Sequence, residues 1–75
     1  MKNINDLIGA LREERRQLLR EIYKLGNFII SEDFDKIDKE NKVLLCEQLE
    51  NMRRFEQTLC KRITHEICLK NRQGE

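Results

Sequence analysis

The sequence predicts an all-α protein, an antiparallel two-helix hairpin with a short corner turn that assembles as a homo-oligomeric helical bundle. Three observations lead to this expectation. The 75 residues include no Pro and only three Gly, so residues that interrupt helices are scarce. Apolar residues recur at three- and four-residue steps along two long segments, which is the period of an amphipathic helix. One break, rich in residues that cap helices, separates the two segments.

The first helix is expected over about residues 4–30. Arg15 stands where its apolar repeat is interrupted. Asn3 or Asn5 can cap the start, because a short side-chain oxygen accepts a hydrogen bond from a free backbone N–H group. Two glycines lie within the helix, and Gly26 suggests a close helix approach or a kink. The apolar repeat consists of Ile4, Leu7, Leu11, Leu18, Ile22, Leu25 and Ile29.

The corner is expected within residues 31–38. Ser31 can cap a short helical turn, and Phe34 and Ile37 are spaced three apart, so both can fold back under the corner. Asp38 is placed to cap the second helix.

The second helix is expected over about residues 39–71, followed by a frayed tail at 72–75. With a chain this short, residues 1–75 form a single domain. The apolar repeat of this helix consists of Leu45, Leu49, Met52, Phe55, Leu59, Ile63 and Ile67.

In a single hairpin each helix packs against only one other helix, which leaves some of the apolar side chains exposed. This surplus predicts a homo-oligomer, most simply a dimeric four-helix bundle. The residues concerned are Ile8, Leu19, Tyr23 and Ile30 on the first helix and Leu44 and Phe55 on the second.

The composition argues against several functions. Fifteen basic and fourteen acidic residues give a net charge of +1, which disfavours nucleic acid as a partner. No signal peptide and no apolar run near the roughly 20 residues of a membrane span are visible, so a soluble cytoplasmic protein without membrane contact is expected. His65 has no nucleophile at a suitable spacing and no glycine-rich phosphate loop exists, so neither enzyme activity nor a cofactor is expected.

Three cysteines, Cys46, Cys60 and Cys68, are widely spaced and form no C-x-x-C pair. A zinc site would need all three to converge with His65, which a single helix cannot achieve. We therefore expect no metal and interpret the cysteines as small apolar fillers in a reducing cytosol.

A row of cations runs along the first helix at four-residue steps. Like charges at this spacing repel by roughly 0.2–0.5 kcal/mol per pair, so the row requires neighbouring acids or an external anion. Glu13 and Glu21 each precede a cation by three residues, whereas Arg12 and Arg20 have no acid three or four positions away. A solvated outer face and an anion site are both open interpretations. The cation row consists of Arg12, Arg16, Arg20 and Lys24.

Tyr23 adds an aromatic ring to this row. On a helical wheel it lies between Leu19 and Arg16, near Asn27. A ring beside Arg and Asn side chains suits a nucleobase with its phosphate, because stacking contributes ~1–3 kcal/mol per base and Arg binds phosphate oxygens in pairs. Tyr23, Arg16, Arg20 and Asn27 are therefore candidate ligand-binding residues. Sealing of an oligomer edge by Tyr23 is the alternative.

Gln48 and Arg62 lie at the margin of the second helix's apolar stripe. Gln48 is expected to form a hydrogen bond across the two helices near Leu25, and Arg62 an ion pair with Glu14. At a symmetric interface, copies of Gln48 and Arg62 would converge and line a cavity, so both are further candidate ligand-binding residues.

The residues at a set of positions between 28 and 63, about half of the chain, form a distinctive pattern. This pattern resembles the one shared by short helical-hairpin proteins encoded by bacteriophages. Most matching positions are apolar, so the pattern specifies a fold more than a function. The positions are Phe28–Ile29, Ser31, Phe34, Leu44–Leu45, Gln48–Leu49, Met52, Phe55, Leu59 and Arg62–Ile63.

In size and architecture such hairpins are similar to phage sponges, small oligomeric helical proteins that sequester cyclic nucleotide signals of CBASS or Thoeris immunity. The sequence lacks the N-terminal Gly-Tyr-Arg-type signature of the best-known sponges, so no ligand residue is carried over. The resemblance implies a non-catalytic immune-evasion protein in the cytoplasm of an infected bacterial host, which sequesters a cyclic nucleotide or ADP-ribose-type signal at an oligomer interface. The alternative is a protein-binding hairpin that acts on a host or phage protein as an inhibitor or assembly adaptor.

Overall fold

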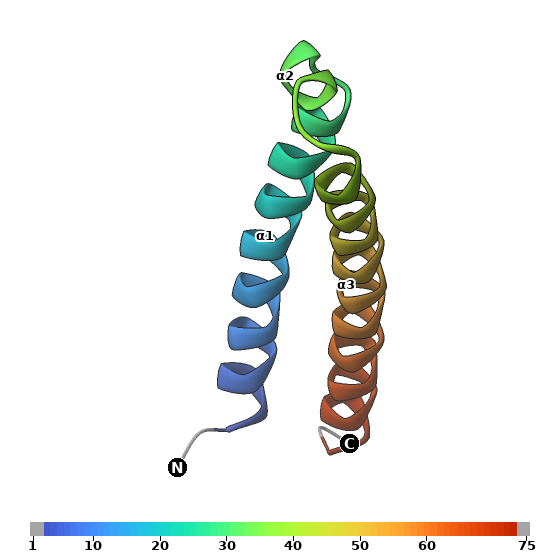
Figure 1. Ribbon diagram of the computed structural model, residues 1–75. Helices are drawn as coiled ribbons and strands as arrows, with labels where there is room; N and C mark the ends of the chain where they lie inside the picture. Colours follow the sequence, from blue (N-terminus) through green and yellow to red (C-terminus); the bar gives the residue numbers. More distant parts are fainter. Residues whose placement is uncertain (1–2, 74–75) are drawn as a thin grey trace.

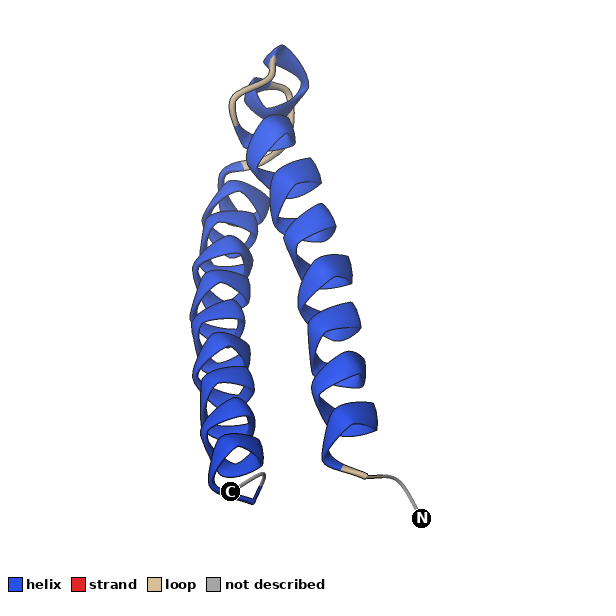
Figure 2. Cartoon of the chain, turned by 180° about the vertical axis from the view of Figure 1, so that it is seen from behind, coloured by secondary structure: helices blue, strands red, loops and turns tan. Residues whose placement is uncertain are grey.

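Two long helices lie side by side and are joined at one end by a compact corner (Figure 1). The computed structural model describes residues 3–73, which form α1 (Ile4–Ile29), α2 (Glu32–Asp35) and α3 (Lys39–Gln73). These residues contain no strand, so the prediction of an all-α protein is confirmed. α1 begins and α3 ends at the same end of the molecule, away from the loops of the corner (Figure 2).

α1 begins with a capping box. The Asn3 side chain accepts a hydrogen bond from the Asp6 N–H group at 3.0 Å, and the Asp6 carboxylate accepts one from the Asn3 N–H group at 3.4 Å. Of the two expected caps, Asn3 therefore takes this position and Asn5 lies within the helix. α1 continues without interruption through Gly26, where an added Cβ would meet no atom within 4 Å, so neither a kink nor a close approach of α3 is found at this residue in the single chain.

The corner is held by contacts with the last turn of α1 and the first turn of α3. The Ser31 hydroxyl donates a hydrogen bond to the Phe28 carbonyl at 2.6 Å, and Ser31 makes no side-chain cap for α2, contrary to expectation. Phe34 packs edge-on against Phe28, with ring centroids 6.1 Å apart. Asp38 accepts a hydrogen bond from the Asn41 N–H group at 3.1 Å, as expected of the cap of α3, and this contact lowers the pKa of Asp38.

α3 continues through Arg72 and Gln73, two residues beyond the expected end. Lys70 and Arg72 lie in its last turn, where positive charge is favourable beside the free carbonyl groups. The rest of the expected tail, residues 74–75, lies outside the described residues.

The interface between α1 and α3 forms a thin core. Ile8, Leu11 and Leu59 are its buried hydrophobic residues, and Leu59 is fully buried. Ile8 was expected at an exposed edge and is buried because it lies one turn before Leu11 on the same face of α1. Leu18 and Leu49 are only half-buried in the single chain.

The hairpin exposes more surface than a compact protein of its mass. Its accessible surface is 6059 Å², whereas a 9.1 kDa monomer typically exposes about 4,900 Å². The molecule measures 57 × 19 × 14 Å, and its radius of gyration is 16.9 Å instead of about 11 Å. Among the described residues, no helix is long and apolar enough to cross a membrane. Large apolar side chains expected at the edges are exposed, namely Leu19, Tyr23, Ile30, Leu44 and Phe55.

Candidate functional site

A shallow depression of about 520 Å³ lies along the middle of α1. Its residues are spaced by three, four, seven and eight positions, so a single helix places them on one face. The structure thus brings together three of the predicted ligand-binding residues, Arg16, Arg20 and Tyr23. Tyr23 is largely exposed, since 71% of the residue is accessible to solvent. This tyrosine patch is lined by Arg16, Leu19, Arg20, Tyr23 and Lys24.

The cations of the row differ in their partners. Arg16 forms an ion pair with Glu13, and Lys24 forms one with Glu21 at 3.7 Å, so the expected partial neutralisation is confirmed. Arg12 and Arg20 make no ion pair with any carboxylate of residues 3–73. Within the tyrosine patch, Arg20 is therefore the cation that is available to a bound anion.

The other predicted site residues lie apart from the tyrosine patch. Asn27 is exposed one turn beyond Tyr23 and does not line the depression. Arg62 is exposed on α3. Gln48 is also exposed and does not lie at the interface with α1, because the adjacent Leu49 faces the core and neighbouring residues of a helix point about 100° apart. Gln48 instead lines an open trough on α3 of about 520 Å³, formed with Leu44, Glu47, Asn51, Met52 and Phe55.

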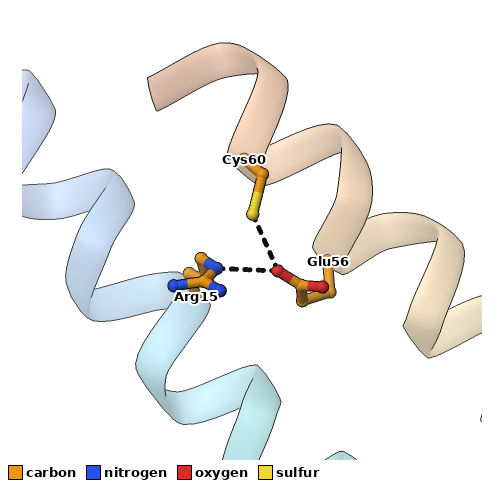
Figure 3. A network of polar contacts seen from close by, with 3 residues as sticks. All are labelled: Arg15, Glu56 and Cys60. Carbon is orange, nitrogen blue, oxygen red and sulfur yellow. Dashed lines mark hydrogen bonds and ion pairs between the residues drawn. The ribbon is translucent and has the colours of Figure 1, made fainter. Parts of the chain in front are cut away.

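A polar contact that was not predicted joins the two long helices. Arg15 Nε donates to Glu56 Oε2 at 2.7 Å, and Cys60 Sγ donates to the same oxygen at 2.8 Å (Figure 3). The expected ion pair between Glu14 and Arg62 is wrong, since the ion pair between α1 and α3 is Arg15–Glu56.

The shared oxygen explains the protonation behaviour of the three groups. The Cys60 thiol and the Arg15 guanidinium both stabilise the Glu56 carboxylate, so the pKa of Glu56 is lowered. The same carboxylate raises the pKa of the Cys60 thiol and that of Arg15. A low-pKa, reactive thiolate is thus disfavoured at Cys60.

The remaining cysteines are free. Cys46 and Cys68 are exposed on α3, so their interpretation as apolar fillers does not hold for the single chain. Cys60 is half-buried but makes a polar contact with Glu56. Within residues 3–73, no three His, Cys, Asp or Glu side chains gather closely enough to hold a metal ion.

Together, the fold and the tyrosine patch define a small helical hairpin with a cationic, aromatic surface patch on its first helix. Comparison with known protein families gives a match to the Sequestin family over residues 5–65, and the chain belongs to that family. The matched region includes the tyrosine patch and the Arg15–Glu56 contact. No curated protein and no solved structure matches the chain.

Proposed function

We propose that this protein is a non-catalytic binding protein that sequesters an intracellular nucleotide signal, either a cyclic nucleotide or a molecule of the ADP-ribose type. The name of the Sequestin family supports a sequestering role. The observation that carries the proposal for a nucleotide is the tyrosine patch, where an exposed aromatic ring lies in one depression with Arg20, a cation that makes no ion pair with residues 3–73.

Each part of the patch suits one part of a nucleotide. The faces of Tyr23 are accessible for stacking on a base, and Leu19 supplies an apolar contact beside it. Arg16 and Arg20 can donate paired hydrogen bonds to phosphate oxygens, while Lys24 adds a point charge. Arg16 would exchange its exposed partner Glu13 for the ligand at small cost, because surface ion pairs contribute little.

A second copy of the chain is the proposed cover for the ligand. All five residues of the patch belong to α1, so one chain leaves the bound molecule open on its outer side. Ligand sites of proteins typically bury about 70–90% of a small molecule. The hairpin exposes about 1,200 Å² beyond the surface of a compact monomer, more than the roughly 800 Å² that each partner of a typical interface buries.

Sequestration requires affinity and abundance and no turnover. A protein that holds a signalling molecule stoichiometrically lowers its free concentration by mass action. If the chain comes from a bacteriophage, as its resemblance to phage hairpins implies, the molecule withheld would be an immune signal of the infected host.

Thermal shift with a nucleotide panel tests this proposal. The panel contains cyclic dinucleotides, cyclic trinucleotides, ADP-ribose and cyclic ADP-ribose. A ligand at 100 times its Kd stabilises the folded protein by ~2.7 kcal/mol, which corresponds to a shift of several degrees in a domain of this size. The ligand should be recovered chemically intact after the complex is denatured. No shift with any member, or recovery of a cleaved product, would contradict the proposal.

A second candidate function rests on the α3 trough. Leu44 is 52% exposed and Phe55 is 45% exposed, and both lie on one face with Met52 close to them. An apolar face of this kind can receive an amphipathic helix of another protein, as expected of an inhibitor or an assembly adaptor. Loss of a partner from pull-downs with Phe55→Lys, but not with Tyr23→Ala, would favour this function.

A further inference from the structure

A cleft of about 360 Å³ lies at the end of the hairpin where α1 begins and α3 ends. Both helices contribute to it, whereas the tyrosine patch and the α3 trough are each lined by one helix. Its polar residues are Asn5 and Arg12 of α1 and Lys70 and Asn71 of α3. We call it the open-end cleft.

The charge of the open-end cleft is positive on both sides. Arg12 and Lys70 face it from different helices, and among residues 3–73 no acidic residue lines it. Neither cation makes an ion pair with a carboxylate of the described residues. Asp6 follows Asn5 in the chain, but its carboxylate accepts a hydrogen bond from the Asn3 N–H group in the capping box.

The floor of the open-end cleft leaves room for a small molecule. Ile8, which is buried, and Ile67 supply its apolar lining. Gly9 also lines it, and a Cβ at this position would meet no atom within 4 Å. The absence of a side chain at Gly9 therefore keeps space open beside Arg12.

We infer that the open-end cleft binds a small oxyanion, namely inorganic phosphate or a phosphate monoester. Two cations from opposite helices can neutralise a dianion between them, and the amides of Asn5 and Asn71 can donate hydrogen bonds to its oxygens. The cleft contains no aromatic residue, so it recognises the phosphate group and not a base. This inference does not depend on the nucleotide site at Tyr23.

The test is an NMR titration of the full chain with inorganic phosphate and, separately, with ribose 5-phosphate, at constant ionic strength. Saturable shifts of the Gly9 and Asn71 amide signals are expected with at least one of the two. Tighter binding of ribose 5-phosphate would identify a monoester as the ligand, and equal binding would identify the free anion. Shifts no larger than those in sodium chloride alone would overturn the inference.

Matched variants separate the cleft from nonspecific charge effects. Lys70→Glu is expected to weaken phosphate binding by about tenfold or more, whereas Arg72→Glu, which also removes a cation from the last turn of α3 but does not line the cleft, should change it little. Gly9→Leu should fill the cleft and abolish binding, and Ala10→Leu, at the next and exposed position, should not. Equal effects within either pair would overturn the inference. Circular dichroism of each variant serves as the control for folding.

Discussion

Glu56 links the two helices through a single carboxylate oxygen. It accepts hydrogen bonds from Arg15 on the facing helix and from Cys60 one turn further along α3. The Glu56 side chain is 19% exposed and that of Arg15 is 40% exposed, so water weakens the ion pair without abolishing it.

The contact predicts a specific loss of stability in acid. The pKa of Glu56 is lowered in the folded chain, so its stabilising contribution is present above the unfolded pKa of about 4.3 and is lost as the pH falls through the lower folded value. Melting temperatures between pH 6 and 3 should therefore fall more steeply for the natural protein than for Glu56→Gln. Glu50→Gln, which removes an exposed partner of Arg54 on the same helix, serves as the control and should follow the natural protein. Parallel curves for all three proteins would show that Glu56 makes no special contribution.

Leu59 is the residue on which the thin core depends most. It is the one fully buried large side chain among the described residues, and Leu59→Ala should lower stability by ~2–5 kcal/mol. Val43→Ala, at a position that is 57% exposed, should change the denaturation midpoint little. Chemical denaturation compares the two variants. If the denaturation midpoint of Leu59→Ala were as high as that of Val43→Ala, Leu59 would not be a core residue.

Relations within one helix are more predictable from the sequence than relations between two helices. Helical spacing alone places Arg16, Arg20 and Tyr23 on one face, although Asn27, one turn further along α1, does not line the depression. Arg15 was recognised as an interruption of the apolar repeat, but its partner depends on the register between α1 and α3. An acidic residue within the apolar stripe of the second helix, such as Glu56, is the sequence signal that could have indicated a partner for Arg15.

At the scale of the elements, local signals decide where each helix begins. Asn3 and Asp38 cap α1 and α3 through hydrogen bonds to residues three positions later, and such short-range contacts are readable from sequence. Ser31 does not cap α2 through its side chain, because its hydroxyl turns back toward α1 and donates to the Phe28 carbonyl. The apolar repeats identified both long helices because their period persists over many turns.

The two glycines of α1 make this helix less stable than it would be with alanine at the same positions. Neither Gly9 nor Gly26 has an atom within 4 Å of an added Cβ. Gly9→Ala and Gly26→Ala should therefore each stabilise the chain by up to ~1 kcal/mol through helix propensity. Urea denaturation would measure the gain. A loss of stability in Gly26→Ala alone would show that a partner chain approaches α1 closely at that residue.

For the molecule as a whole, the elongated shape and the exposed apolar residues lead to the expectation of self-association. Light scattering at micromolar concentration should give a mass that is a multiple of 9.1 kDa, and the melting temperature should rise with protein concentration. A 9.1 kDa species with a concentration-independent melting temperature would rule out a stable oligomer and with it the proposed cover of the tyrosine patch.

The most direct test of nucleotide sequestration by the tyrosine patch is calorimetric titration with whichever nucleotide gives a thermal shift. Tyr23→Ala should weaken binding by about 5- to 150-fold, because base stacking contributes ~1–3 kcal/mol. Arg20→Glu should weaken it further and reduce its dependence on salt, since repulsion replaces attraction. Lys61→Glu, an exposed change on α3 outside the patch, should bind like the natural protein. Unchanged affinity in both Tyr23→Ala and Arg20→Glu would contradict a ligand site on this face of α1.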